Sequence, residues 1–425
     1  INTLFNQGLS LDQAPPISIP FRFFLSAPIF GVLLGLLILF SSSLEITNQY
    51  SSIAIAAVHL FTLGILSMII FGAMQQMMPV LAGAVIKKPL LFGNIVHTSL
   101  VLGTLGFTCS FIFDIKMFLH IGVMFLSISF LVFFILTIKL LFKVDYLTPT
   151  VKAMRLFSIA GLITFFFGLY LAFFHISANM SENYYFFVNT HILFALFGFA
   201  ILLIMGVSFQ VIPMFYVAKD FPKFVQNKVP FIVFLLLFIT ALFFFFEINF
   251  FVLKLVFAII FIVFSYFGLN SLNNRKRPVF DVTLWYWKLS LFMLSFSMII
   301  WLFDIFESNF ILAIIFAFGF LYSLLQGMVY KIIPFLAWFH LSSKGYFSLP
   351  TIREFIEEKK IKYHFFIHLI SIIFFVLGYF INIFLYLAAI AFIISNILFF
   401  INCLLGIKKY SKIAKTDPMD MSAFK

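Results

Sequence analysis

Histidine is the residue of this chain most capable of ligand or proton chemistry, and two histidines open long apolar runs. His59 begins HLFTLGILSMIIFGAMQQMMPVLAG, and His191 begins HILFALFGFAILLIMGVSFQVIPMF. Ionisable groups within a membrane span are costly and are candidates for function. Imidazole also binds haem iron and copper. His59 and His191 are therefore candidate cofactor and metal ligands, with an interfacial hydrogen bond as the alternative for each.

Two further histidines are candidate cofactor ligands, because His120 begins the fourth apolar run and His175 ends the fifth on the same expected side of the membrane. Both lie close to loops, which favours an interfacial role. His364 and His368 have the i,i+4 spacing that can hold a metal, but no HEXXH motif surrounds them. They adjoin a lysine-rich loop, so we expect a pair that reaches the polar interface.

The methionines Met74, Met77 and Met78 could bind a soft copper ion. In a run this apolar, helix packing is the favoured interpretation. The two cysteines, Cys109 and Cys403, lie in apolar runs and predict no disulfide framework.

The composition predicts a membrane protein, because 64% of the 425 residues are hydrophobic and only 10% are charged. Apolar runs of about 20 residues recur along the chain, which is the length of a membrane-spanning helix. The runs lack strand-like alternation, so we expect helices rather than a barrel. No cleavable signal peptide is apparent. We expect twelve spans, near 20–44, 52–80, 91–113, 117–143, 153–176, 186–215, 229–247, 250–272, 282–306, 309–339, 364–382 and 384–406.

Charge placement predicts the orientation of these spans. The net charge of +12 comes from lysines and arginines clustered in alternate short loops, which is typical of a topology signal and not of nucleic-acid binding. An even number of spans puts both termini on one side, here the cytoplasm. We expect a multi-pass protein of the bacterial inner membrane, with a cytoplasmic loop at 341–362 that contains a short surface helix and a cytoplasmic tail at 407–425.

Three of the runs share the pattern G-x7-G-x6-P, which predicts an internal repeat. Three copies in the same phase argue against chance in glycine-tolerant membrane helices. They predict three four-helix units, 20–143, 153–272 and 282–406, around a pseudo-threefold axis. The glycines would allow close helix approach or leave room beside a flat ligand, and the prolines would end each helix. The motif residues are Gly64, Gly72 and Pro79; Gly198, Gly206 and Pro213; and Gly319, Gly327 and Pro334.

His59 and His191 occupy different positions relative to this repeat. His59 precedes Gly64 by five residues, whereas His191 precedes Gly198 by seven. The two-residue offset corresponds to about 200° of helix rotation, so the two rings need not face one shared site.

The chain resembles the haem–copper oxidase subunit I superfamily, and most closely its NnrS-like members. The resemblance rests on the threefold four-helix pattern, on FRFFLSAPIFG in the first span, and on a histidine twenty residues before a proline in the second, here His59 and Pro79. It implies that His59 is a haem ligand and His191 a metal ligand. The resemblance covers the whole chain in architecture, but the local motif only the first two spans.

This chain departs from that superfamily at several ligand positions. The seventh span has no histidine pair, and the tenth has Leu312 and Ile314 where the repeat would place a histidine. The resemblance therefore implies one haem b rather than an oxygen-reducing centre with copper. His59 would be one axial ligand, and His191, His120 or His175 the other.

Three functions are compatible with these observations. The first is a haem-binding protein in respiratory electron transfer, nitric oxide handling or assembly of a respiratory complex, with other respiratory subunits, a cytochrome or quinol as partners besides the lipid bilayer. The second is a transporter or channel for a small solute or copper, because repeats and intramembrane glycines also suit transport. The third is a structural subunit of a larger membrane complex.

Overall fold

The computed structural model describes residues 15–177, 183–306, 309–346, 349–416 and 418. Within this part of the chain, twelve helices are long and apolar enough to cross a membrane. Each begins and ends within about two turns of its expected position, which confirms the multi-pass helical class. The spans are α1 (Ser18–Phe40), α3–η2–α4 (Ser52–Ala82), α5 (Pro89–Phe113), α6 (Lys116–Leu141), α7 (Pro149–Ser177), α8–η3–α9 (Tyr184–Tyr216), α10 (Lys223–Phe245), α11 (Phe251–Asn273), α12 (Thr283–Phe303), α13–η4–α14 (Asn309–Ser343), α15 (Glu358–Phe380) and α16 (Asn382–Ile413).

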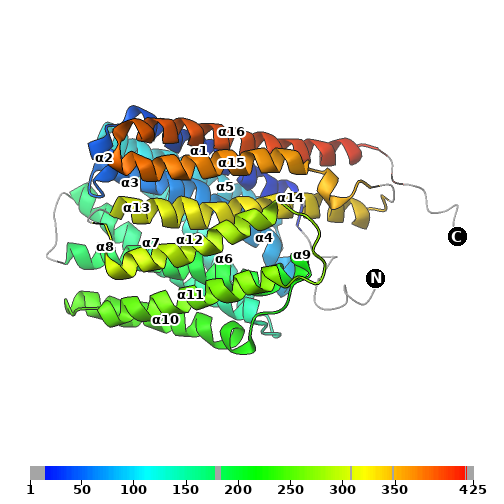
Figure 1. The fold of residues 1–425 in the computed structure, drawn as a ribbon, viewed down its shortest axis with the longest axis horizontal. Coiled ribbons are helices and arrows are strands. Elements are labelled where there is room, and N and C mark those ends of the chain that lie inside the picture. Colours follow the sequence, from blue (N-terminus) through cyan, green and yellow to red (C-terminus); the bar gives the residue numbers. More distant parts are fainter. Residues whose placement is uncertain (1–14, 178–182, 307–308, 347–348, 417, 419–425) are drawn as a thin grey trace.

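The spans lie side by side in one bundle, with α15 and α16 at one edge and α10 and α11 at the opposite edge (Figure 1). Along the chain, α6 packs against α7 and α11 packs against α12. The last span returns to the first, because α16 packs along α1. The first and last spans are therefore neighbours, and the order of spans closes on itself.

Three spans form the inside of the bundle, and each contains a π-helical segment. The second, sixth and tenth spans are the most deeply buried of the twelve. In each one, an eight-residue π-helix has a glycine as its fifth residue: Gly64, Gly198 or Gly319. The segments are η2 (Leu60–Ser67) between α3 (Ser52–His59) and α4 (Met68–Ala82), η3 (Phe194–Ile201) between α8 (Tyr184–Leu193) and α9 (Leu202–Tyr216), and η4 (Ile315–Tyr322) between α13 (Asn309–Ile314) and α14 (Ser323–Ser343).

Aromatic rings join the three inner spans to one another. Phe71 contacts Phe199 with ring centroids 6.3 Å apart, which links the second span to the sixth. The Phe197 and Phe316 centroids, 6.4 Å apart, link the sixth to the tenth. A third contact, between Phe61 and Phe318 at 5.5 Å, links the second to the tenth. Phenylalanine rings therefore occupy the interior between these helices.

The six motif glycines pack against the span that precedes each inner span. Gly64 and Gly72 face Phe30 and Phe23 of α1, and a β-carbon added at either position would lie 2.6 Å or less from the phenylalanine. The other four glycines repeat this arrangement. Gly198 and Gly206 face Ala160 and Ala153 of α7, and Gly319 and Gly327 face Met293 and Tyr286 of α12.

These contacts decide between the two roles expected for the glycines. The partner residues are seven apart in every pair, so the two helices run alongside each other through both contacts. Side chains of the preceding span fill the space that the glycines leave. The glycines therefore serve close helix packing, and the alternative of room beside a flat ligand is wrong for these positions.

The expectation that the prolines end the inner helices is wrong. Pro79 and Pro213 lie inside α4 and α9, each of which continues for three more residues. Pro334 lies well inside α14, which continues to Ser343. The second span ends instead at Gly83, whose φ of 66° is the left-handed conformation that glycine adopts without a steric penalty.

The predicted loop at 341–362 is shorter than expected. The helix α14 extends to Ser343 and α15 begins at Glu358. Between them, the described residues contain one 3-10 turn, η5 (Ile352–Glu354), which Thr351 and Glu354 cap reciprocally. The short surface helix is therefore a single turn, and most of the EEKKIKY segment belongs to α15.

Replacing Gly206 tests the glycine contacts. Its added β-carbon would lie 2.3 Å from the Ala153 β-carbon, and its carbonyl accepts a 2.8 Å hydrogen bond from the Thr150 hydroxyl. Gly206→Val should destabilise the protein by about 1–3 kcal/mol, the usual cost of overpacking. The measurement is the melting temperature of the detergent-solubilised protein. Ala313→Val, at an exposed position of α13, is the control, and equal melting temperatures for the two variants would contradict the packing role.

Candidate functional site

The structure brings His59 and His191 together, although their sequence offset left this open. Their ring centroids lie 6.4 Å apart and their planes differ by 18°. His59 is the last residue of α3, directly before the π-helix of the second span, and His191 lies in α8, three residues before the π-helix of the sixth. Both rings are half-buried.

Backbone hydrogen bonds fix which ring nitrogen of each histidine is free. The Nδ1 of His59 lies 2.8 Å from the carbonyl oxygen of Ile55, and the Nδ1 of His191 lies 3.0 Å from that of Thr164. A carbonyl oxygen can only accept, so both Nδ1 atoms carry the proton and donate it. Each Nε2 then retains its lone pair, which is the state in which histidine binds a metal.

Neighbouring spans shape the environment of this pair. A β-carbon at Gly168 would lie 2.8 Å from Cε1 of His191, so the glycine makes room for the ring. The same helix, α7, supplies the Thr164 carbonyl one turn earlier. On the other side, the Phe107 ring of α5 lies 4.8 Å from the His59 ring. The pair is therefore held by four spans, the second, third, fifth and sixth.

The other two candidate ligands lie outside this pair. His175 is exposed and contacts Phe111, with ring centroids 5.2 Å apart. His120 is exposed and hydrogen-bonds the Lys116 carbonyl of its own helix at 2.8 Å. Both geometries match the interfacial role favoured for these residues.

The number of metal-ligating side chains limits which metal or cofactor His59 and His191 could bind. Among the residues that the structure describes, no three His, Cys, Asp or Glu side chains are grouped as a metal site. The pair offers two imidazole nitrogens. The ring centroids lie 6.4 Å apart, so one nitrogen from each ring could hold a single metal ion.

His364 and His368 are placed differently from the prediction. Both rings are fully buried, so the expected interfacial pair is wrong. The Nδ1 of His364 lies 2.7 Å from the Tyr286 hydroxyl and 2.9 Å from the Tyr330 hydroxyl, while its Nε2 lies 3.0 Å from the Ser395 hydroxyl. Burial without a partner would be costly for such groups, and these hydrogen bonds make the burial tolerable.

Two phenol hydroxyls share one nitrogen of His364, which is unusual. Tyr330 also accepts a 3.0 Å hydrogen bond from the Asn402 amide, so its own proton is directed to His364. Tyr286 competes for the same ring nitrogen. A proton placed on the imidazole or on either phenol therefore has a hydrogen-bond partner within 3 Å.

The network extends one turn deeper along α15. The Ser323 hydroxyl donates to the Phe318 carbonyl at 3.0 Å and lies 2.9 Å from Nε2 of His368, which must therefore donate to it. The Nδ1 of His368 has no hydrogen-bond partner among the described residues. The last residue of the π-helix η4, Tyr322, donates to the buried Asn396 side chain. This polar cluster belongs to the ninth to twelfth spans.

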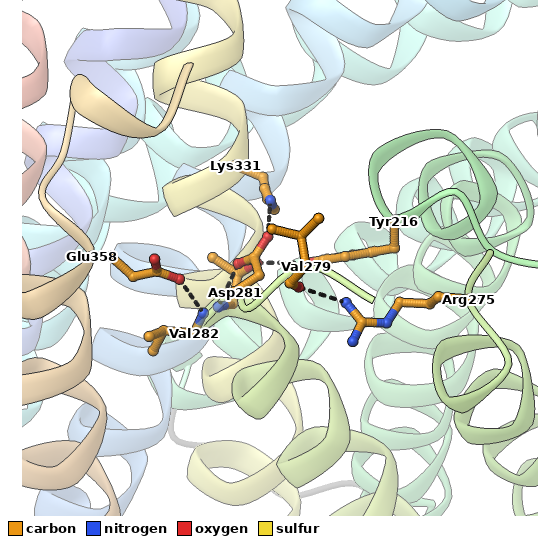
Figure 2. A network of polar contacts seen from close by, with 8 residues as sticks. Tyr216, Arg275, Val279, Asp281, Val282, Lys331 and Glu358 are labelled. Atoms are coloured by element: carbon orange, nitrogen blue, oxygen red, sulfur yellow. Dashed lines mark hydrogen bonds and ion pairs between the residues drawn. The ribbon is translucent and has the colours of Figure 1, made fainter. Parts of the chain in front are cut away.

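A second polar network lies near the start of α12 and includes a largely buried ion pair (Figure 2). Lys331 of α14 pairs with Asp281, and their side chains are 17% and 10% exposed. Asp281 also accepts hydrogen bonds from the backbone and hydroxyl of Thr283, the first residue of α12, at 2.9 and 2.6 Å. Lys331 additionally lies over the Tyr216 ring, 5.0 Å from its centroid.

This ion-pair network connects elements that are distant in sequence. Tyr216, at the end of α9, hydrogen-bonds the Thr283 hydroxyl at 2.8 Å. Glu358, the first residue of α15, accepts a 3.0 Å hydrogen bond from the Val282 backbone. Figure 2 shows both contacts converging on the start of α12. The sixth, ninth, tenth and eleventh spans are fixed to one another here.

Comparisons with known proteins add no assignment. The sequence matches no protein-family model, and the search of curated proteins found no match.

Sequence reasoning missed the cluster around His364, although a signal was present. Ser395 and Asn402 are seven residues apart in the last span, and Asn396 adjoins Ser395, so polar residues recur along one region of an otherwise apolar helix. His364, His368 and Ser371 do the same in the preceding span. When two successive apolar helices each carry a row of polar residues, the two rows together predict that the helices contact each other through those residues.

The shared nitrogen of His364 gives a stability test. His364→Leu should leave three buried hydroxyls without this partner, at about 1–3 kcal/mol for each group left unsatisfied. Tyr286→Phe should cost much less, because it removes one of two competing donors. Melting temperatures of both variants in detergent check the order, and a larger loss for Tyr286→Phe would contradict the network as described.

Proposed function

We propose that this chain is a haem-binding membrane protein in which His59 and His191 ligate the iron. The observation that carries the proposal is the facing pair of imidazoles with both Nε2 lone pairs free. Six-coordinate haem b takes two ligands from the protein, because its macrocycle supplies the other four donors. A bare copper or zinc ion is usually held by three or four side chains, so the pair suits haem better than copper.

The chain's own residues would orient and shield such a group. The Ile55 and Thr164 carbonyls hold the two rings in fixed tautomers, which raises the basicity of the free nitrogens. Phe107 gives the site an apolar wall. When bound, a bis-histidine haem supplies a one-electron redox centre.

We further propose a three-unit arrangement similar to haem–copper oxidase subunit I. Three π-helices with a glycine at the same position support it, as do three equivalent glycine contacts and the packing of α16 against α1. The tenth span has no histidine at the positions that correspond to His59 and His191. The seventh span, α10, contains no histidine. We therefore propose respiratory electron transfer, nitric oxide handling or assembly of a respiratory complex, without oxygen reduction, in the bacterial inner membrane with both termini cytoplasmic.

A reduced-minus-oxidised spectrum of the purified protein tests the haem proposal. We expect a Soret band and bound iron in the wild type, and loss or a shift of that band in His59→Ala and in His191→Ala. His120→Ala is the matched control, because this exposed ring contacts its own helix, and its spectrum should equal that of the wild type. Absence of both the band and iron after expression with ample haem would overturn the proposal.

A second candidate function is the transport of protons or another small solute, and the buried cluster of the ninth to twelfth spans favours it. Asn402 also donates to the Lys360 carbonyl at 3.3 Å, near the start of α15. From there, hydrogen bonds lead through Tyr330 to His364. The His368 ring follows, with its centroid 6.3 Å from that of His364. This sequence of groups runs from a helix end toward the middle of the bundle.

Proton flux into proteoliposomes under an imposed membrane potential tests the transport candidate. We expect flux above that of empty liposomes, and a loss of most of it in His364→Gln, which keeps hydrogen-bonding groups but does not carry a proton. His120→Gln should conduct as the wild type does. Equal flux in wild-type and empty liposomes would exclude proton transport, and haem binding in the spectral test is independent of this result.

A further inference from the structure

A basic cavity lies at one end of the bundle, among α6, α7 and α10. Its volume is about 330 Å³. Its lining includes Lys152 and Arg155 from the first two turns of α7 and Lys228 from the second turn of α10. Phe142, directly after α6, and Phe231 of α10 complete its apolar part. Three cationic side chains thus share one cavity near the ends of three spans.

The positive charge of this cavity is not neutralised by the protein. Among the described residues, the ion pairs involve other lysines, and none includes Lys152, Arg155 or Lys228. The Arg155 guanidinium is partly engaged, because Nε and Nη2 donate to the Leu141 carbonyl at 3.0 and 2.8 Å. These bonds hold the guanidinium in place beside the Phe142 ring, 4.7 Å from its centroid. A fixed guanidinium and two exposed lysines therefore give the cavity a net positive charge.

The apolar residues of the cavity indicate where the rest of the ligand would lie. Phe142 and Phe231 are 52% and 53% exposed and belong to the outer surface of a membrane-spanning bundle. The cavity can accommodate a phosphate ester headgroup, and its aromatic residues lie at the bilayer-facing side. Acyl chains would extend outward along these aromatic rings.

We propose that this cavity binds the headgroup of an anionic phospholipid. Basic pockets between spans near a membrane surface are suited to such headgroups, because the lysines and arginine neutralise the phosphate charge while the chains stay in the bilayer. The free amide oxygen of Asn227, whose nitrogen donates to the Lys223 carbonyl at 3.0 Å, can accept from a headgroup hydroxyl. This site is separate from the His59–His191 pair and does not depend on haem.

Native mass spectrometry of the detergent-solubilised full chain tests the proposal, with phosphatidylglycerol, phosphatidylcholine and inorganic phosphate as separate probes. We expect phosphatidylglycerol to remain bound at the highest collision energy. The double variant Lys152→Gln/Lys228→Gln should weaken this binding roughly twenty-five-fold, since one lysine near anionic lipid contributes about fivefold. Arg155 is left unchanged because it also holds α6.

A charge-matched control distinguishes lipid binding at this cavity from general electrostatic attraction between the protein and anionic lipid. Lys408→Gln/Lys412→Gln removes two exposed lysines of α16 and should bind phosphatidylglycerol as the wild type does. Equal weakening in both double variants would overturn the proposal, because binding would then follow net charge alone. Equal binding of phosphatidylcholine, or equally tight binding of inorganic phosphate, would also overturn it, since the cavity would then select an acyl chain or a free anion.

Discussion

Close contact between each inner span and the span before it is the constraint on which the rest of the structure depends. In a bilayer, lipid chains are as apolar as the helices, so association relies on close packing rather than on the hydrophobic effect. Glycines eight residues apart let Phe23, Ala153 and Tyr286 approach the inner helix backbones. Because this contact occurs three times, three inner helices are brought into the bundle, where phenylalanine rings join them.

The π-helices follow from the same region of each inner span and affect the candidate haem site. Each π-helix contains the first motif glycine and inserts a local change in helix phase. His59 is directly before one of them and His191 is three residues before another. The two-residue offset of His59 and His191 relative to the motif glycines was counted for uniform α-helices. It does not decide whether side chains on two different spans come into contact. Here the His59 and His191 rings lie near each other, with centroids 6.4 Å apart, because α5 packs beside His59 and α7 packs beside His191.

Networks of hydrogen bonds between buried side chains are unevenly distributed among the three proposed units. The last four spans contain both the His364 cluster and the Lys331–Asp281 pair. The interior near the first two units is largely aromatic, as shown by the stacked rings of Phe71 and Phe133, 3.7 Å apart. Haem binding and proton movement, if both occur, would therefore use different parts of the bundle. The two proposed functions do not compete for the same residues.

The sequence by itself determined the class of protein, the number of spans and the three glycine motifs, because hydropathy and spacing are properties of local segments. It also identified His59 and His191 as the histidines of interest. Only the tertiary structure decided that these two rings lie next to each other and that His364 and His368 are buried. It also decided that neighbouring side chains occupy the space beside the motif glycines. Each of these depends on which helices are neighbours and how they are rotated. In an almost uniformly apolar chain, the pattern of hydrophobic residues does not reveal which face of a helix meets lipid and which meets protein.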